Sequence, residues 1–543
     1  MGLRLIYSAK ESISDEVRAV PENTSQLVWG ALFLFCLVKI PMLFVTNNPE
    51  ELRDFDHFLR MASGQTAYRD FVWLYGPLSP LVYGTLLKVL PEKLLMVRIL
   101  SFLFWLPATI WLSQLLIRYQ LRRAGYWLGV LFVTGLSSYP SYSHNHIIPA
   151  AALVGVIFYF TRFQERRDVS DLHSSFALAL VIFFSRPILM GYGVLGLWGV
   201  LFLSDKDLSE RSRLALFYAG AFLGAVALFR FIYGPGLWSA FYPQPWAILE
   251  TKSYPNLHYL IPQPKFFGQA GVILFLKQIR AAMETCVFYL HYFIWPTLIL
   301  TLASFIKGRL EVRAAAVAAG FAVMASLDLL HYGFSDPMNE QAMWVRGQYF
   351  FAGSALSLFL ILGHAVTEAR TFFLRFLSLA LLLIVGVWSY LPWMVGMSHL
   401  VRYPRNQFNF PALTGITTHG DRTSALEAIQ FVNGLCRNSP KSVVFPQYEP
   451  GMARLLRCND LFEKDSYLFT RMPWYVLKAN ETPYAPGGQS TNGEVIDRGL
   501  ASGDPRIFVI QGKSPYSIYC QKPGWQTRVF GEGSLGRTVC WRD

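Results

Sequence analysis

The sequence is short of charged residues. Only 15% of its 543 residues are charged, whereas 53% are hydrophobic and 16% are aromatic. The mean hydropathy is +0.33. So little charge excludes an ordinary soluble enzyme and predicts a multi-pass membrane protein.

Several sequence motifs are also absent. There is no G-x-G-x-x-G fingerprint and no Walker loop, so the chain offers no nucleotide-binding loop of either kind. No small-residue cleavage site follows the first apolar run, which predicts a membrane anchor and not a removed signal peptide. No internal repeat is found, which disfavours a transporter.

Positive charge exceeds negative charge, but it is not spread as in a nucleic-acid-binding protein. The net charge is +13, and the basic residues gather in short loops between apolar runs. By the positive-inside rule these loops are cytoplasmic, and no nucleic-acid partner is expected. The clusters are Arg118/Arg122/Arg123, Arg162/Arg166/Arg167, Lys206/Arg211/Arg213, Lys307/Arg309/Arg313 and Arg370/Arg375.

The apolar runs predict a polytopic α-helical protein with about 11 transmembrane helices within residues 1–394. An odd number puts the two ends on opposite sides of a plasma or inner membrane. With a cytoplasmic N-terminus, the segments 47–93 and 233–285 and the region 395–543 are extracytoplasmic. Around Arg186-Pro187 the run could be two short spans or a re-entrant hairpin. The predicted spans are 27–46, 94–117, 126–142, 146–162, 173–187, 188–203, 213–232, 286–306, 313–331, 347–366 and 374–394.

The region 395–543 differs in composition from the rest. It is rich in Pro, Gly and Asn, with short apolar runs such as KSVVFPQ and RIFVIQG, which predicts a small soluble α/β domain. It also holds four of the six cysteines, which in an extracytoplasmic domain most simply form two disulfides. Three pairings are possible, and a zinc site is the alternative, although no C-x-x-C pair occurs. Sequence proximity favours Cys436–Cys458 and Cys520–Cys540.

The segment 47–93 carries the most informative pattern. Apolar residues recur at helical spacing from Glu50 to Ser63, which predicts a helix along the membrane surface, with Pro49 at its start and Gly64 at its end. Tyr-Arg-Asp-Phe follows at 68–71 and Tyr-Gly-Pro-Leu at 75–78. This order resembles the first extracytoplasmic loop of the GT-C superfamily of membrane glycosyltransferases. It is most similar to the branch that includes protein mannosyltransferase-like and aminoarabinose-transferase-like enzymes.

The resemblance implies a GT-C fold, a polyprenyl-phosphate-linked sugar donor and an aspartate of this loop as the catalytic base. Asp54 and Asp56 are two residues apart and point to different faces of a helix. Asp56 has Arg53 and Arg60 at ion-pair spacing, which favours Asp54 as the base. The family's aspartate lies further from the glycine, so Glu50 and Glu51 stay as candidates. The alternative is that these aspartates are solvent-exposed and have no catalytic role, because the helix dipole favours acidic residues at the start of any helix.

Two arginines and several polar residues complete the predicted site. Arg186 interrupts an apolar run and Arg346 precedes another, so both could bind the donor phosphate or could extend to the lipid headgroups. The histidines could contact substrate or bind a divalent cation such as Mg²⁺ or Mn²⁺. Asp70 could also fix its loop, and the aromatic loop 233–285 could also anchor in the interface. The predicted substrate contacts are Asp70, Tyr75, His144, His146, Tyr254 and His258.

Together these patterns predict an inverting membrane glycosyltransferase. It would move a sugar from a polyprenyl-phosphate donor in the bilayer to an extracytoplasmic glycan, glycolipid or protein. The C-terminal domain would recognise the acceptor or a partner. The alternatives are a cell-surface polysaccharide ligase or polymerase, and a lipid or glycan transporter.

Overall fold

A computed structural model describes the following parts of the chain, with short gaps inside several ranges: 24–45, 49–119, 126–134, 146–205, 208–241, 315–324, 393–402, 408–416, 421–437 and parts of 442–460 and 506–542. Most of the spans predicted beyond residue 285 lie outside these residues. So do four of the predicted site residues, which are His144, Tyr254, His258 and Arg346.

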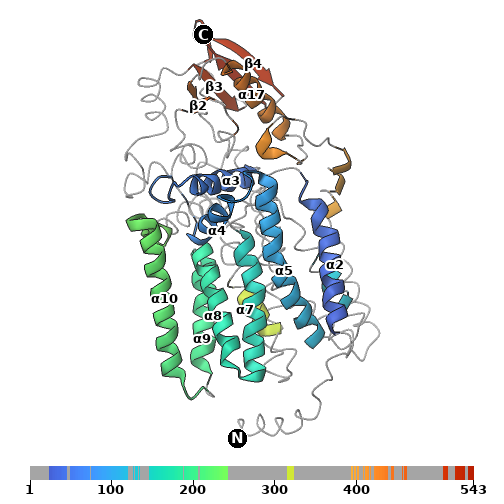
Figure 1. Ribbon diagram of the computed structural model, residues 1–543, viewed down its shortest axis with the longest axis vertical. Helices are drawn as coiled ribbons and strands as arrows, with labels where there is room; N and C mark the ends of the chain where they lie inside the picture. The colour runs from blue at the N-terminus through green and yellow to red at the C-terminus, as the bar shows by residue number, and fades with distance from the viewer. Residues whose placement is uncertain are drawn as a thin grey trace, which may run out of the picture.

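Within the described residues, six long helices form a bundle with roughly parallel axes (Figure 1). Four segments of this described part are long and apolar enough to cross a bilayer, and they are 24–42, 94–118, 147–166 and 211–238. The prediction of an integral membrane protein therefore agrees with the described helices, whereas the number of spans in the whole chain stays a prediction. The six helices are α2 (Thr24–Met42), α5 (Leu94–Tyr119), α7 (Ile147–Arg166), α8 (Val169–Ser185), α9 (Leu189–Ser204) and α10 (Arg211–Tyr233).

The apolar run around Arg186-Pro187 forms two helices. Proline has no N–H to donate, and Arg186 leaves the helical conformation at φ −149°, so α8 ends there. Gly191 then donates to the Arg186 carbonyl at 3.1 Å as α9 begins. α8 and α9 have 17 and 16 residues, about 24–26 Å each, and α8 packs against both α7 and α9. Both are shorter than the candidate spans, and the two short spans and the re-entrant hairpin both stay predictions.

The two ends of the bundle differ in character. Basic residues occupy the last turns of α5 and α7 and the turns at 167 and 211, which lie at one end (Figure 1). Several of these arginines pair with carboxylates: Arg118 with Glu165, Arg162 with Asp171 at 3.2 Å, and Arg167 with Asp205. The short helices α3 (Pro49–Ala62) and α4 (Leu78–Leu87) lie at the other end.

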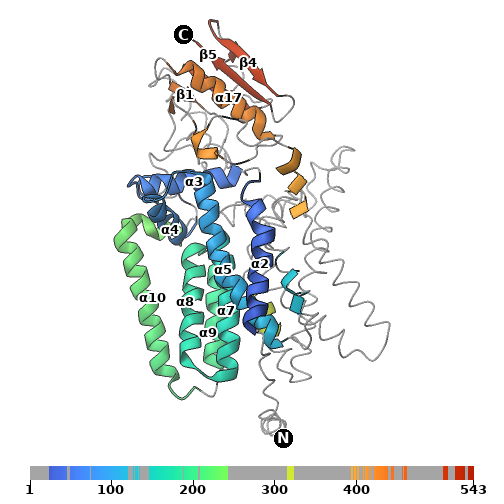
Figure 2. The same ribbon diagram turned by 45° about the vertical axis from the view of Figure 1, so that its right-hand side comes forward.

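Helix α3 lies across that end of the bundle (Figures 1 and 2). Its bounds confirm the helix predicted over 50–63, and Gly64 ends it with φ +93°, a conformation that suits glycine. α3 and α4 pack closely, because a Cβ at Gly84 would meet the Cβ of Met61 at 2.4 Å. The loop after the first span therefore folds into a helical layer over the bundle.

The C-terminal region forms a mixed sheet covered by one helix. The strand order is β2-β1-β3-β5-β4, with β1 parallel to β2 and β3, and β5 antiparallel to β3 and β4. Disulfides join Cys436 to Cys458 and Cys520 to Cys540, the pairing that sequence proximity favours. A small α/β domain is therefore present. Its elements are α17 (Asp421–Leu435), β1 (Ser442–Val444), β2 (Asn459–Asp460), β3 (Ile507–Gln511), β4 (Gln526–Phe530) and β5 (Arg537–Trp541).

The C-terminal domain sits on α3. Phe408 and Leu413, the latter in the short 3₁₀ helix η5 (Pro411–Leu413), share one buried apolar cluster with Leu426 of α17 and with Leu52 and Leu59 of α3. α3 is thus enclosed between the bundle and the domain (Figure 2). Residues of the predicted catalytic loop consequently lie where the two parts of the protein meet.

Candidate active site

A buried cationic cluster lies where α7 begins and α8 ends. Arg186, which caps α8, is only 1% exposed, and His146 at the start of α7 is 2% exposed. The Arg186 Nη1 lies 3.2 Å from His146 Nε2. Because a guanidinium only donates, a hydrogen bond between them requires Nε2 to accept, which it does in the imidazole tautomer protonated on Nδ1 alone. The guanidinium carbon also lies 5.3 Å from the ring centroid of Tyr75, within cation–π range.

The Tyr-Gly-Pro turn is fixed directly against the end of α8. The Gly76 N–H donates to the Ser185 carbonyl at 3.0 Å. Glycine is required there, because a Cβ on residue 76 would lie 2.0 Å from the Phe184 carbonyl oxygen. Tyr233 at the end of α10 donates to the Pro77 carbonyl at 2.6 Å. The turn thus holds the Tyr75 ring against Arg186 and His146.

The Tyr-Arg-Asp-Phe motif forms a tight loop of its own. Tyr68 adopts a positive φ of 65°, unusual for a residue with a side chain, and its hydroxyl donates to the Tyr75 carbonyl at 2.5 Å. Asp70 accepts from the Thr66 N–H at 2.7 Å and pairs with Arg69 at 2.8 Å. These contacts are those of a residue that fixes the loop, which was the alternative to a substrate contact for Asp70.

Helix α3 presents its two aspartates differently. Asp56 pairs with Arg60 one turn later, with Oδ2 and Nε 2.9 Å apart, whereas the side chain of Arg53 lies outside the described residues. Asp54 is fully buried. Burial raises the pKa of the Tyr83 hydroxyl in α4, a hydrogen bond with Ser101 opposes that rise, and the Asp54 carboxylate adds to it. Asp54 lies one turn before Phe58, whose ring stacks on that of Tyr83 with centroids 4.6 Å apart, so the two residues share the face of α3 that meets α4.

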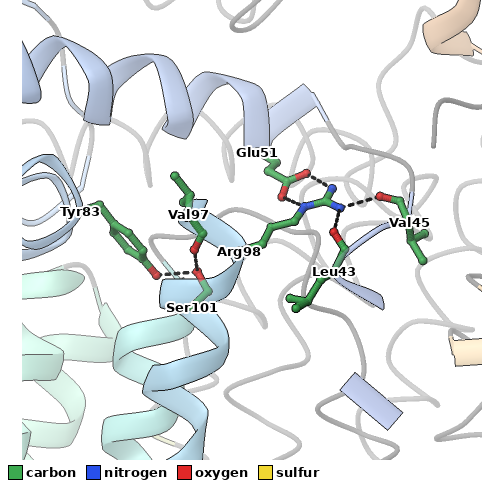
Figure 3. A network of polar contacts seen from close by, with 7 residues as sticks. All are labelled: Leu43, Val45, Glu51, Tyr83, Val97, Arg98 and Ser101. Atoms are coloured by element: carbon green, nitrogen blue, oxygen red, sulfur yellow. Dashed lines mark hydrogen bonds and ion pairs between the residues drawn. The ribbon is translucent and has the colours of Figure 1, made fainter. Parts of the chain in front are cut away.

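A third acidic residue of α3 is bound to α5. Glu51 and Arg98 are both fully buried and form a bidentate ion pair, at 2.6 and 2.7 Å (Figure 3). Arg98 Nη1 also donates to the carbonyls of Leu43 and Val45, at 2.6 and 2.7 Å. This network joins the end of α2 and the start of α3 to α5. Glu51, one of the residues left open as the base, is thereby a partner of Arg98.

Aromatic rings connect α3 to the cationic cluster. The Trp73 ring lies 5.3 Å from His57 and 5.9 Å from Phe58, both on α3. On its other side it lies 5.3 Å from the ring of Tyr75, and its Nε1 donates to the Gly76 carbonyl at 2.9 Å. Trp73 therefore packs between α3 and Tyr75, and so connects the acidic helix to the cluster around Arg186.

The structure brings together three residues that the sequence predicted separately, Tyr75, His146 and Arg186. Trp73 and the pairing of Glu51 with Arg98 were not predicted from the sequence. Arg98 carried a usable signal, because it interrupts an apolar run just as Arg186 does. Trp73 carried none, since a tryptophan near a membrane surface is common.

The predicted divalent cation has no site among the residues described. No group of three or more His, Cys, Asp or Glu side chains comes together there as a metal site would need. His144, one of the predicted ligands, lies outside those residues. Mg²⁺ or Mn²⁺ dependence thus stays a proposal to be tested with the protein.

Several solved structures are similar to this chain. ArnT from Cupriavidus metallidurans, in its apo state, matches with a TM-score of 0.50 and 12% sequence identity, over 95% of this chain and 97% of that chain. The oligosaccharyltransferase AglB from Archaeoglobus fulgidus, in complex with an inhibitory peptide and a dolichol-phosphate, gives a TM-score of 0.46 at 10% identity, over 90% and 69% of the two chains. An A. fulgidus oligosaccharyltransferase complex with Zn and sulfate gives 0.45 at 11%, over 94% and 73%.

No protein family and no curated protein matches the sequence. The match to ArnT, which extends over nearly the whole of both chains, shows that the two proteins share a fold. The resemblance inferred from residues 47–90 is confirmed at the level of the fold. At such low identity the likeness concerns the fold alone, and substrates are not carried over.

Proposed function

We propose that this protein is an inverting glycosyltransferase that moves a sugar from a polyprenyl-phosphate-linked donor to an acceptor outside the cytoplasm. The carrying observation is the buried cluster of Arg186, His146 and Tyr75, which Trp73 connects to the acidic helix α3. A cation and a carboxylate in one packed region are what such a transfer needs.

Arg186 is proposed to bind the phosphate of the donor. A guanidinium binds phosphate oxygens with two parallel hydrogen bonds, and burial strengthens that attraction. His146 and Tyr75 hold the guanidinium in place, through the 3.2 Å contact and the aromatic face. Arg346 is proposed as a second phosphate ligand, although it lies outside the described residues. Negative charge that develops on the departing phosphate would then be stabilised.

Asp54 is proposed as the general base. Its carboxylate takes the proton of the acceptor hydroxyl while the hydroxyl oxygen bonds to the anomeric carbon and the bond from that carbon to the phosphate oxygen breaks. The preference for Asp54 over Asp56 rests on the sequence, in which Arg53 and Arg60 flank Asp56 at ion-pair spacing. Asp54 is buried on the face of α3 that meets α4. Glu50, whose side chain lies outside the described residues, stays the alternative base.

The proposed orientation of the protein in the membrane rests on the distribution of basic residues and on the disulfides of the C-terminal domain. The end of the bundle rich in arginine faces the cytoplasm, as the positive-inside rule requires. α3, α4 and the disulfide-bonded domain then lie outside, where disulfides persist. Because the C-terminal domain packs on α3, it is positioned to recognise the acceptor glycan, glycolipid or protein. His144, Tyr254 and His258 are proposed to contact the substrates.

The test is transfer of a radiolabelled sugar from polyprenyl-phosphate donors by the protein in lipid nanodiscs, with and without EDTA. We expect Asp54→Asn to lower turnover about 10²–10⁴-fold, the range for a lost general base, while Asp56→Asn retains most activity. Unchanged thermal unfolding of both variants is the control. Loss of activity in Glu50→Gln instead would move the base to Glu50. Full activity in all three variants would contradict the acidic-loop mechanism.

A polysaccharide ligase or polymerase is the second candidate function. The specific observation in its favour is the contact between Arg186 and His146, because such an enzyme could use arginine and histidine without an acidic helix. It predicts that Arg186→Gln and His146→Asn abolish activity while Asp54→Asn does not. The same transfer assay, with a lipid-linked glycan as donor, separates the two candidates.

A further inference from the structure

Aromatic side chains hold every carbonyl of the Tyr-Gly-Pro turn. The three carbonyls, those of residues 75–77, each accept a hydrogen bond from a different ring-bearing residue. The donors are the Tyr68 hydroxyl at 2.5 Å, Trp73 Nε1 at 2.9 Å and the Tyr233 hydroxyl at 2.6 Å. Because peptide groups are planar, these three bonds fix the orientation of three successive peptide planes.

The peptide group between Tyr75 and Gly76 is held at both of its polar atoms. Its carbonyl accepts from Tyr68, and its N–H donates to the Ser185 carbonyl at the end of α8, at 3.0 Å. The two bonds together set the direction in which the Tyr75 side chain leaves the turn. That side chain places its ring centroid 5.3 Å from the guanidinium carbon of Arg186. The hydrogen bonds of the turn therefore set where the ring meets Arg186.

Tyr233 brings a helix from far along the sequence to this turn. It is the last residue of α10, 156 residues from Pro77. Other parts of α10 are exposed, as at Leu216 (76%) and Phe231 (88%), whereas Tyr233 is buried. The Pro77 carbonyl also accepts from the Leu81 N–H, but at 3.4 Å. The Tyr233 hydroxyl, at 2.6 Å, is therefore the stronger partner of this carbonyl.

The residues after α10 keep Tyr233 and Tyr68 together. The 3₁₀ helix η2 (Gly234–Ala240) packs on the backbone of Tyr68, because a Cβ at Gly236 would lie 2.6 Å from the Tyr68 carbonyl oxygen. The rings of Tyr68 and Tyr233 meet edge to face, with centroids 5.4 Å apart. The two tyrosines thus form a packed pair, and their hydroxyls bond the two carbonyls that flank Gly76.

We propose that Tyr68 and Tyr233 are positioning residues for the donor site. Their hydroxyls hold the Tyr-Gly-Pro turn in the orientation that places the Tyr75 ring on Arg186, and a guanidinium held in place binds a phosphate at a lower entropic cost. Both tyrosines act through Tyr75 and Arg186. The inference rests on the proposed function of Arg186, and it adds the end of α10 and the start of the segment 233–285 to the site.

The test begins with Tyr233→Phe, which removes the hydroxyl and keeps the ring. In the transfer assay we expect the KM for the donor to rise about tenfold, because a buried carbonyl loses its donor, while kcat and the KM for the acceptor stay within about twofold. Tyr126→Phe is the matched control, since the buried Tyr126 hydroxyl donates to the Leu27 carbonyl at the same 2.6 Å. It should leave both KM values unchanged.

A second measurement reports the placement of Arg186 without using activity. Phenylglyoxal modifies accessible arginine side chains, and mass spectrometry of the digested protein gives the extent of modification at each arginine. We expect Tyr233→Phe to raise the modification of Arg186 several-fold and to leave Arg98, which is as deeply buried, at the wild-type level. Tyr126→Phe should change neither. Loss of stability alone would raise the modification of both arginines.

Tyr68→Phe tests the inference from the other side of Gly76, and it serves if Tyr233→Phe fails to fold. It should also raise the donor KM and the modification of Arg186. The inference is overturned if a folded variant changes neither quantity, or if the modification of Arg98 rises as much as that of Arg186. If the wild type transfers no sugar from polyprenyl-phosphate donors while Tyr233→Phe still exposes Arg186 selectively, the proposed function fails and the positioning of Arg186 is retained.

Discussion

Arg98 and Arg186 both lie deeply buried at the end of the bundle that carries α3, and their surroundings differ. Arg98 is fully buried and makes four hydrogen bonds, two to the Glu51 carboxylate and two to backbone carbonyls of residues 43 and 45. Arg186 is 1% exposed and contacts the imidazole of His146 and the ring of Tyr75. The two arginines are therefore about equally buried but contact different kinds of group, and their proposed roles differ accordingly.

The local backbone explains why Arg98 is needed where it is. The last carbonyls of a helix have no partner within that helix, and those after α2 would be buried beneath α3. Arg98 satisfies two of them and holds the start of α3 through Glu51. Arg186 lies instead where the Tyr-Gly-Pro turn meets the end of α8. One arginine joins three helices, and the other lies beside a motif of the proposed active site.

The largest expected effect is at Arg98. Arg98→Met leaves Glu51 buried without its cation and should lower the free energy of unfolding by about 3–5 kcal/mol. Thermal unfolding of the purified protein measures this loss. The double variant Arg98→Met/Glu51→Met removes both charges and should recover much of the stability. If the double variant is as unstable as the single one, the carbonyl contacts and not the ion pair hold α3.

Arg186 should show the opposite pattern, with lost activity and nearly retained stability. Arg186→Gln removes the cation proposed to stabilise the departing phosphate, and loss of one such donor typically costs about 10²–10³-fold in turnover. Initial rates against donor concentration measure it, with Arg186→Lys as an intermediate that keeps the charge but not the planar fork. If Arg186→Gln instead unfolds as readily as Arg98→Met, the two arginines do not differ in role.

The sequence was sufficient to predict features that depend on the type and spacing of neighbouring residues. The helix of the catalytic loop was predicted within one residue, because its apolar spacing and the flanking Pro49 and Gly64 are local signals. The break at Arg186-Pro187 followed from proline chemistry in the same way. Pairings across long separations could not be predicted. Glu51 and Arg98 are 47 residues apart, and nothing local shows that they meet.

The same limit applies to the site itself. Tyr75, His146 and Arg186 were each singled out on the sequence, but their convergence depends on the packing of α4, α7 and α8. The sequence predicted that Gly76 belongs to a rigid turn. Only the folded structure shows that Gly76 lies close to Phe184 of α8. Local chemistry therefore predicted the components of the site, and tertiary packing decided which of them contact one another.

The smallest expected effect is that of Gly76→Ala, which tests the packing of the Tyr-Gly-Pro turn against α8. Gly76→Ala places a methyl group 2.0 Å from the Phe184 carbonyl oxygen and 2.7 Å from the Ser185 carbonyl carbon, backbone atoms that no change of rotamer can move. The turn must shift away from α8, at a cost of about 1–3 kcal/mol in unfolding free energy. Gly196→Ala on α9 is the matched control, since a Cβ there meets no atom within 4 Å.

Because Tyr75 shifts with the turn, the Gly76→Ala variant should also raise the KM for the donor while Asp54 stays in place on α3. That outcome would tie the position of Tyr75 to donor binding at Arg186. An unchanged KM in a correctly folded Gly76→Ala protein would separate the turn from the donor site. Arg186 would then have to hold the phosphate without help from the Tyr75 ring.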